Sequence, residues 1–249
     1  MTTIPPELQR IIAQAKQQNP QLSHLPDEVV AQLLLQALQA GPPADEQDLA
    51  SMSAIELIGA GEQLMNVGRW QEAERYFLQA METAENANDL QMQTTAAAGL
   101  GRLCFQRADF PQAMALHQQA LALAERIGDQ RLLGVIYNEM GTIYAMQSRY
   151  SQAIEYCKRS LEIMEQLGEN VAPSYSNLGE VYRRQGDYDR AIQTHKKAIE
   201  LSIKTGRERI AAKLYGNLGL VYQDQGQYDL AIEMYQKDLE IALRIGNQQ

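Results

Sequence analysis

Few residues in this sequence have side chains that bind metals or attack substrates. The chain of 249 residues has three histidines and two cysteines. Zinc is held when about four thiolate or imidazole ligands converge at short, fixed spacings. These five residues are instead far apart along the chain: His24, Cys104, His117, Cys157 and His195. We therefore predict no metal site and no bound cofactor.

Two stretches resemble the start of a dinucleotide-binding loop, GAG at residues 59–61 and GLG at residues 99–101. Such a loop needs a third glycine and a preceding strand, because its glycines let the backbone approach a pyrophosphate at the start of a helix. Neither stretch has the third glycine, and neither follows a strand pattern. Since no Ser, His and Asp triad and no phosphate-cradling loop stands out either, we predict no catalytic residues and no enzyme activity.

The charge balance and the hydrophobic pattern exclude further classes of function. With 22 Lys and Arg against 31 Asp and Glu, the net charge is −9, and no basic cluster is present to bind nucleic acid. No stretch approaches about 18 consecutive apolar residues, and the N-terminus MTTIPPELQR has no signal-peptide pattern. We expect a cytoplasmic protein that neither inserts into membranes nor binds nucleic acid.

A repeat of about 40 residues organises the chain. It is marked by five anchor glycines, spaced by 40, 40, 38 and 40 residues: Gly61, Gly101, Gly141, Gly179 and Gly219. The position sixteen residues after each anchor is filled by Phe77, His117, Cys157, His195 and Tyr235. Because histidine and cysteine share this column with aromatic residues, we predict that they pack in the core.

The apolar spacing within each repeat predicts two helices joined by a turn. In the last repeat, Tyr215, Leu218 and Tyr222 lie on one face of a helix, and Ala231 and Leu239 begin and end the stripe of a second helix. A glycine inside a helix costs up to ~1 kcal/mol, so each anchor should mark a close approach of two helices. Left-handed residues are expected to end the second helices: Asn88, Gly128, Gly168, Gly206 and Gly246.

These columns resemble the tetratricopeptide repeat, in which Leu-Gly, Tyr and Ala recur at fixed offsets. The resemblance covers Ala54 to Gly246, and its clearest copies are residues 175–200 and 215–240. It implies an all-α fold, a right-handed superhelical solenoid of helix-turn-helix repeats whose concave groove binds a peptide or helix of a partner protein. The repeats are about six residues longer than the common form of about 34 residues, as in the LGN/Pins scaffolds and many bacterial signalling proteins.

The resemblance divides the chain into an N-terminal segment and an array of repeats. Residues 1–50 are expected to form a helical segment and linker, with helices at Pro6–Gln17 and Pro26–Ala40. Residues 51–249 are expected to hold five repeats, at about 54–88, 94–128, 134–168, 172–206 and 212–246. The spacing of Ser53 and Glu56 predicts a capping box at the start of the array.

The groove positions of the family give the residues expected to contact a ligand. They lie on the first helix of each repeat: Ile58, Glu62, Met65, Arg102, Phe105, Asn138, Thr142, Met146, Ser176, Asn177, Glu180, Arg183, Arg184, Lys213, Asn217, Leu220 and Gln223. Apolar ligand side chains are expected near Met65, Phe105 and Met146. Acidic ligand groups are expected near Arg183, Arg184, Lys213 and Asn217. For Phe105, packing against a neighbouring helix is an equally weighted alternative.

The function that the resemblance implies is that of a protein-interaction scaffold or adaptor. A second hypothesis is a signal-responsive regulator, in which residues 1–50 mask the groove or one end of the array. A third, more remote hypothesis is the recognition arm of a larger enzyme or signalling protein. The apolar residues Leu239, Ile241 and Leu243 in the last helix also predict either self-association or further repeats at the C-terminal end.

The fourth repeat departs from the others. Its anchor follows the third after 38 residues instead of 40, and Pro173 lies near the expected start of its first helix. Proline is tolerated only in the opening turn of a helix, so this helix should begin late. The wall of the groove is therefore expected to be notched between the third and fourth repeats.

Overall fold

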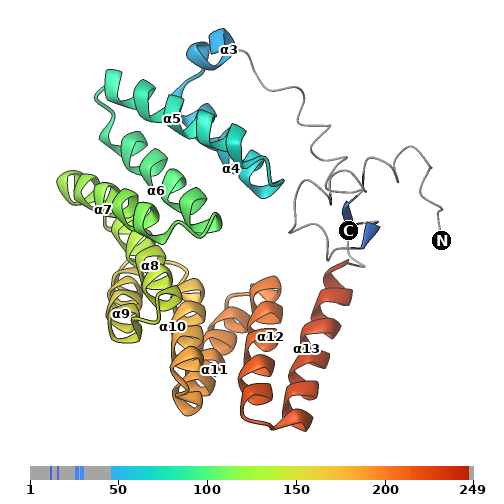
Figure 1. Cartoon of the computed structure of the whole chain (residues 1–249). Coiled ribbons are helices and arrows are strands. Elements are labelled where there is room, and N and C mark those ends of the chain that lie inside the picture. The colour runs from blue at the N-terminus through green and yellow to red at the C-terminus, as the bar shows by residue number, and fades with distance from the viewer. Residues whose placement is uncertain (1–11, 13–15, 17–25, 28, 31–45, 247–249) are drawn as a thin grey trace. The chain divides into compact units, whose positions relative to one another are not determined.

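The structure, a computed structural model, describes residues 12, 16, 26, 27, 29, 30 and 46–246, and every regular element in these residues is a helix (Figure 1). The chain forms two compact units, residues 1–103 and residues 104–249. The helices expected at Pro6–Gln17 and Pro26–Ala40 lie largely outside the described residues. The prediction of an all-α fold is confirmed. Among the described helices, none combines the length and the hydropathy of a membrane-spanning segment.

The helices follow one another in the predicted order of helix, turn and helix. In the first unit, α3 (Glu46–Ser51) precedes the pair α4 (Ala54–Asn66) and α5 (Trp70–Asn86). The helix α6 (Leu90–Gln106) runs across the boundary between the units. The second unit contains α7 (Phe110–Ile127), α8 (Gln130–Met146), α9 (Tyr150–Gln166), α10 (Ala172–Gln185), α11 (Tyr188–Lys204), α12 (Glu208–Asp224) and α13 (Tyr228–Gly246).

The start of α4 has the capping box that the sequence predicts. Ser53 Oγ accepts a hydrogen bond from the Glu56 backbone N–H at 3.4 Å, and the Glu56 carboxylate accepts one from the Ser53 backbone N–H at 2.9 Å. The two bonds satisfy backbone donors that the first turn of a helix leaves without a partner. Local sequence alone therefore sets the beginning of this helix.

The anchor glycines lie where two helices approach closely, as predicted. The described facing pairs are Gly61 with Phe77, Gly141 with Cys157, Gly179 with His195, and Gly219 with Tyr235. A Cβ atom added to these glycines would lie 3.1, 2.8, 2.6 and 2.6 Å, respectively, from the nearest atom of the facing side chain. Since real Cβ atoms rarely have contacts this short, the repeat needs glycine at this column so that the second helix can pack against the first.

The turns between helices need left-handed backbone, and three of the described turns achieve it without glycine, at Asn88, Ala108 and Ser148. The predicted end caps are confirmed at Asn88, Gly128, Gly168 and Gly206, whose φ angles lie between 54° and 70°. The prediction is wrong for Gly246, which belongs to α13 and has no positive φ angle. Within the helix pairs, Gly68, Gly186 and Gly226 also have positive φ angles. Ala108 and Ser148 occupy the equivalent position in the second and third repeats, with φ angles of 60° and 59°. A side chain in this conformation costs free energy that glycine avoids.

The helix α10 begins late, as Pro173 predicts. The helices α6, α8 and α12 each begin eleven residues before their anchor glycine, whereas α10 begins at Ala172, seven residues before Gly179. Pro173 occupies the first turn, where its missing N–H is not needed. The residues that form the first turn in the other helices are a loop here, residues 169–171. The fourth repeat therefore lacks one helical turn at its start.

Candidate functional site

In the second unit, α10 contacts both α8 and α12. All three are the first helices of their repeats, and they carry the predicted groove residues of this unit except Phe105, which lies on α6. We call their shared face, built from Asn138, Thr142, Met146, Ser176, Asn177, Glu180, Arg183, Arg184, Lys213, Asn217, Leu220 and Gln223, the first-helix surface. It is the candidate binding site that the fold assembles within one unit.

Two asparagine side chains join these helices. Asn177 Nδ2 of α10 donates a hydrogen bond to Thr142 Oγ1 of α8 at 3.0 Å, and Asn217 Nδ2 of α12 donates one to Ser176 Oγ of α10 at 3.1 Å. Thr142 Oγ1 in turn donates to the backbone carbonyl of Asn138 at 3.1 Å. The two predicted amides therefore occupy equivalent positions one repeat apart, and each is held in place by a hydroxyl of the preceding first helix.

Opposite charges neutralise one another beside the amide bridges. Arg183 donates to the two carboxylate oxygens of Glu180 at 2.7 and 2.9 Å and also pairs with Asp224 of α12. Arg184 pairs with the same Glu180 at 2.7 Å. Burial opposes the ionisation of Glu180, but hydrogen bonds from the two arginines outweigh it and lower its pKa. The hydrogen bond to Glu180 is also the main cause that raises the pKa of Arg183.

Apolar side chains remain exposed on the first-helix surface. Met146 is 41% exposed and Leu220 is 40% exposed, and Val135, at the start of α8, is 37% exposed. On α12, Lys213 is exposed and Gln223 accepts a hydrogen bond from the Tyr235 hydroxyl at 2.8 Å. This surface therefore alternates apolar patches with amide, hydroxyl and paired charged groups.

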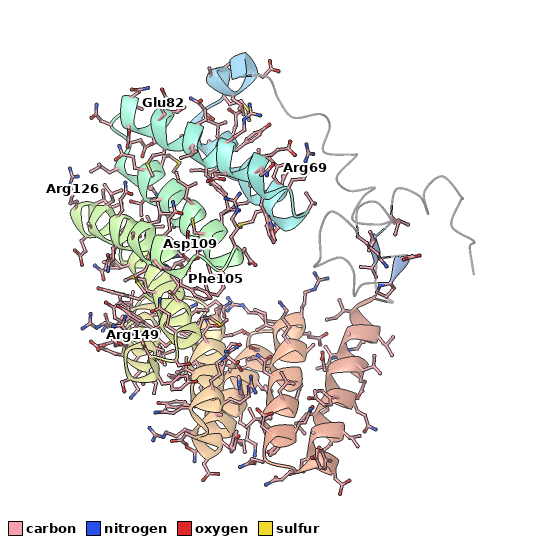
Figure 2. All side chains as sticks on the ribbon, in the orientation of Figure 1. Arg69, Glu82, Phe105, Asp109, Arg126 and Arg149 are labelled. Atoms are coloured by element: carbon pink, nitrogen blue, oxygen red, sulfur yellow. The ribbon has the colours of Figure 1, made fainter. Side chains whose placement is uncertain are left out.

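Phe105 has a packing partner within its own unit. It lies at the C-terminal end of α6, near the start of α7 (Figure 2), and its ring centroid is 5.7 Å from that of Phe110. Phe105 packs, half-buried, on the cluster of Cys104, Ala113 and Ile143. The structure therefore gives Phe105 the helix-packing contact that was one of its two predicted roles.

The predicted groove residues of the first unit differ in exposure. Ile58 is only 6% exposed and belongs to the core, so its side chain offers little surface to a ligand. Met65 is half-buried. Glu62 and Arg102 form an ion pair of 2.8 Å between α4 and α6. In both units, acidic side chains therefore pair with the arginines that the sequence assigned to the groove, Arg102, Arg183 and Arg184.

The missing first turn of α10 leaves a pocket that the sequence indicated only as a notch. Its volume is about 310 Å³, and it lies among α8, α9, α10 and the loop before α10. We call it the notch pocket; it is lined by Arg131, Gly134, Val135, Asn138, Glu139, Ser160, Met164, Glu169, Asn170 and Pro173. Of these residues, only Asn138 was predicted from the sequence as a site residue. The sequence signals of the pocket are the short spacing of 38 residues between Gly141 and Gly179 and the position of Pro173.

His117, His195, Cys104 and Cys157 pack in the core, as predicted, while His24 lies outside the described residues. His117, His195 and Cys157 are 1%, 0% and 0% exposed, and Cys104 is 7% exposed. Burial raises the pKa of Cys157 to about 12 and is the main cause that lowers the pKa of His195 to about 4. His117 Nδ1 lies 3.4 Å from a carboxylate oxygen of Glu139. Within the part of the chain that the structure describes, no three His, Cys, Asp or Glu side chains are grouped to hold a metal ion.

Comparisons with known structures agree with this architecture. BtubC (BKLC) from P. vanneervenii is 20% identical, with a TM-score of 0.66 over 97% of this chain and 93% of that one. The apo form of RapI is 13% identical, with a TM-score of 0.61 over 89% of this chain and 92% of that one. The Rap protein complexed with Competence and Sporulation Factor is 14% identical, with a TM-score of 0.64 over 79% of this chain and 65% of that one. At these identities the likeness establishes the fold alone.

The comparison of sequences is more specific. No curated protein sequence matches the chain. The profile of the tetratricopeptide repeat matches residues 52–126 and 132–204, and a second profile of the same repeat matches residues 212–242. Since the matched residues make up well over half of the sequence, the chain belongs to the tetratricopeptide repeat family.

Proposed function

We propose that this protein binds a segment of a partner protein on the first-helix surface of its second unit, and so acts as a scaffold or adaptor without catalytic activity. The observation that carries the proposal is the pair of amide bridges, Asn177 to Thr142 and Asn217 to Ser176. Each bridge uses one N–H group, and an amide has a second N–H and a carbonyl oxygen with which to bond a ligand backbone. Equivalent amides one repeat apart suit an extended peptide, whose N–H and C=O groups recur along its length.

The exposed apolar side chains support the same proposal. Met146 and Leu220 lie on two of the three helices that carry the bridges, and water contacts about two-fifths of each. Covering such surface with a ligand stabilises a complex by roughly 25 cal/mol per Å² of apolar area. A ligand that places apolar side chains on these residues therefore gains affinity, while the amides fix its direction.

The charges of the site direct an acidic ligand group to Lys213. Arg183 already donates to Glu180 and Asp224, so a ligand carboxylate at Arg183 must compete with two intramolecular ion pairs. Lys213 is exposed on α12, four residues before Asn217 and on the same face of that helix. We expect the acidic preference to come from Lys213 and the neighbouring amide, with the arginines holding adjacent helices together.

Membership of the tetratricopeptide repeat family supports both parts of the proposal, the binding of a partner protein and the lack of catalytic activity. Tetratricopeptide repeats are generally non-catalytic, and they recur as modules that present a repeated surface. The Rap protein with the same fold was solved in complex with Competence and Sporulation Factor. A bound partner is thus one known use of this architecture, and the amide bridges give this chain its own means of holding one.

A random peptide display library tests the proposal. We expect peptides selected on the full chain to bind at least tenfold more weakly to the double variant Asn177→Ala, Asn217→Ala, because two charge-neutral hydrogen bonds to the ligand are lost. The matched control is Gln112→Ala, Gln119→Ala, which removes two exposed amides of α7. Selected peptides that bind wild type and the asparagine variant equally would show that this surface is not the site.

A second candidate function is masking by the N-terminal segment. Ile12 and Val30 are 1% and 0% exposed, and Lys16 forms an ion pair with Asp27 at 2.6 Å, so part of this segment packs against protein. If the segment covers a binding surface, deletion of residues 1–45 should tighten binding of the selected peptides. Unchanged binding by a folded deletion variant would favour the scaffold without self-masking.

A further inference from the structure

The notch pocket is a consequence of the repeat that lost its first helical turn. In the fifth repeat, Ile210 lies in the first turn of α12 and packs on the cluster that contains Ile199. Asn170 stands at the equivalent position of the fourth repeat, nine residues before the anchor, and belongs to the loop before α10. The space that the apolar first turn fills in the fifth repeat is therefore open here, with a volume of about 310 Å³.

The walls of the pocket are apolar along its length. Val135, Met164 and Pro173 contribute side-chain carbons from three different helices. At Gly134 a Cβ atom would lie 2.8 Å from Met164 Cε, so the glycine keeps this wall close to the backbone of α8. Ser160, at the α9 side, already shares a hydrogen bond of 2.9 Å with Ser174 and is satisfied. These walls fit a ligand group with a long aliphatic stem.

The polar lining of the pocket includes a buried acceptor and two carboxylates, those of Glu139 and Glu169. Asn138 Oδ1 is buried and has no hydrogen-bond partner among the described residues. Glu139 is next to it in the lining, with a side chain only 19% exposed. At the rim, the one basic side chain of the lining, Arg131, lies 3.6 Å from Glu169 and is offset by it. A buried acceptor without a donor costs free energy that a bound donor would recover.

We propose that the notch pocket takes a lysine or arginine side chain of a peptide bound on the first-helix surface. The aliphatic stem lies against Val135, Met164 and Pro173, and the charged end donates to Asn138 Oδ1 and the Glu139 carboxylate. The inference rests on the proposed function, because Asn138 belongs both to the pocket lining and to the first-helix surface. An acidic side chain would meet like charge at Glu139, and an apolar one would leave the Asn138 acceptor unsatisfied.

A single-residue probe tests the pocket without a full peptide. Nα-acetyl-lysine N-methylamide is titrated into the full chain, and the methyl resonances of Val135 and Met164 are followed by NMR. We expect saturable shifts with the lysine analogue, and binding about tenfold weaker with the norleucine analogue, which keeps the stem and lacks the charge. Equal binding of the two analogues, or none with lysine, would overturn the proposal.

Two variants locate the charged end of the probe. Glu139→Gln keeps the shape of the side chain and one acceptor oxygen but removes the charge, and it should weaken the lysine analogue about tenfold without affecting norleucine. Asn138→Leu removes the acceptor and serves as a second variant. The matched control is Glu155→Gln, an equal change of charge at an exposed ion pair of α9. A loss of lysine binding in the control equal to that in Glu139→Gln would contradict the assignment.

The display experiment separates this inference from the proposed function. Peptides selected on wild type should contain Lys or Arg at one fixed position, and Glu139→Gln should remove that preference. If peptides are selected without a basic position, the proposed function holds and the pocket assignment is wrong. If the lysine analogue binds as expected but no peptide is selected, the pocket assignment holds and the proposed function is wrong.

Discussion

His195 is buried between α10 and α11 in its neutral form. Its side chain faces Gly179, it is 0% exposed, and neither ring nitrogen has a hydrogen-bond partner among the described residues. Burial is the main cause that lowers its pKa from about 6.5 to about 4, with Arg183 lowering and Glu180 raising it. The unfolded chain therefore binds a proton at this histidine at a higher pH than the folded chain does.

The first prediction concerns acid stability. Since the folded pKa of His195 is depressed, this residue costs no stability above about pH 6.5, where the folded and unfolded chains are both neutral at this site. Stability is lost as the pH falls from 6.5 towards 4, because only the unfolded chain is protonated there. The variant His195→Phe introduces the residue type that the first repeat has at this position, Phe77. At pH 4, the free energy of unfolding of the variant should have fallen by about 3 kcal/mol less than that of wild type. Urea titrations of both proteins between pH 7 and pH 4 measure it. Parallel pH profiles would contradict the prediction.

The second prediction concerns Ala108, which has a φ angle of 60° in the turn between α6 and α7. Glycine holds the equivalent turn position in three other repeats and adopts this conformation without the cost of a Cβ atom. We expect Ala108→Gly to stabilise the protein by about 0.5–1 kcal/mol. Ala115→Gly, at an exposed position inside α7, should instead destabilise it by about 1 kcal/mol. The same sign for both variants in urea unfolding would refute the argument.

At the scale of the helices, the two helices of a repeat can pack closely only because the anchor glycine of the first has no Cβ atom. A Cβ atom at Gly179 would lie 2.6 Å from His195 Cε1, and the ring cannot withdraw because it is fully buried. The third prediction is that Gly179→Ala destabilises the protein by about 1–3 kcal/mol, as overpacking of a core does. Gly59→Ala is the control, because nothing lies within 4 Å of that site in α4, and it should be neutral or stabilising. Thermal unfolding of both variants decides between close approach and helix propensity.

The order and type of the helices followed from the sequence because each repeat carries its own signals. Glycine anchors, alanine columns and capping residues act within one helix or one turn, so their consequences are local. Pro173 also predicted the late start of α10, since a proline restricts only its own first turn. The partners of Asn177 and Asn217 could not be predicted in this way. The hydroxyls that they contact lie 35 and 41 residues away on neighbouring helices.

At the scale of the whole molecule, α13 exposes an apolar face. In the equivalent helix α11, the same face is covered by the next helix, α12. Ile199 of α11 is 6% exposed because it packs against Leu214 and Leu218 of α12. Leu239 occupies the same column of α13 and is 59% exposed, and Ile232 is 53% exposed. Tetratricopeptide units gain much of their stability from the surface shared with a neighbour. This face therefore fits the two occupants that the sequence predicts, a second copy of the chain or further repeats.

The fourth prediction is that self-association depends on this face of α13. Sedimentation velocity at increasing protein concentration should show dimers in wild type, and Leu239→Lys should shift the equilibrium to monomers, because a buried lysine at the contact is costly. Ile203→Lys is the matched control, since Ile203 is 55% exposed on α11, outside the proposed contact. A monomeric wild type at every concentration would exclude the second copy as the occupant.

The repeat, the helix pairs and the core positions of His117, Cys157 and His195 were predictable from residue types at a fixed period. The reason is that helix periodicity, capping and close packing at glycine act over short distances. Only the packing of the helices determines which charged side chains form ion pairs. Arg183, expected from its column to receive an acidic ligand, pairs instead with Glu180 and with Asp224 one repeat away. The notch pocket likewise needed three helices and a loop in place, since the space left by a missing turn depends on what its neighbours fill.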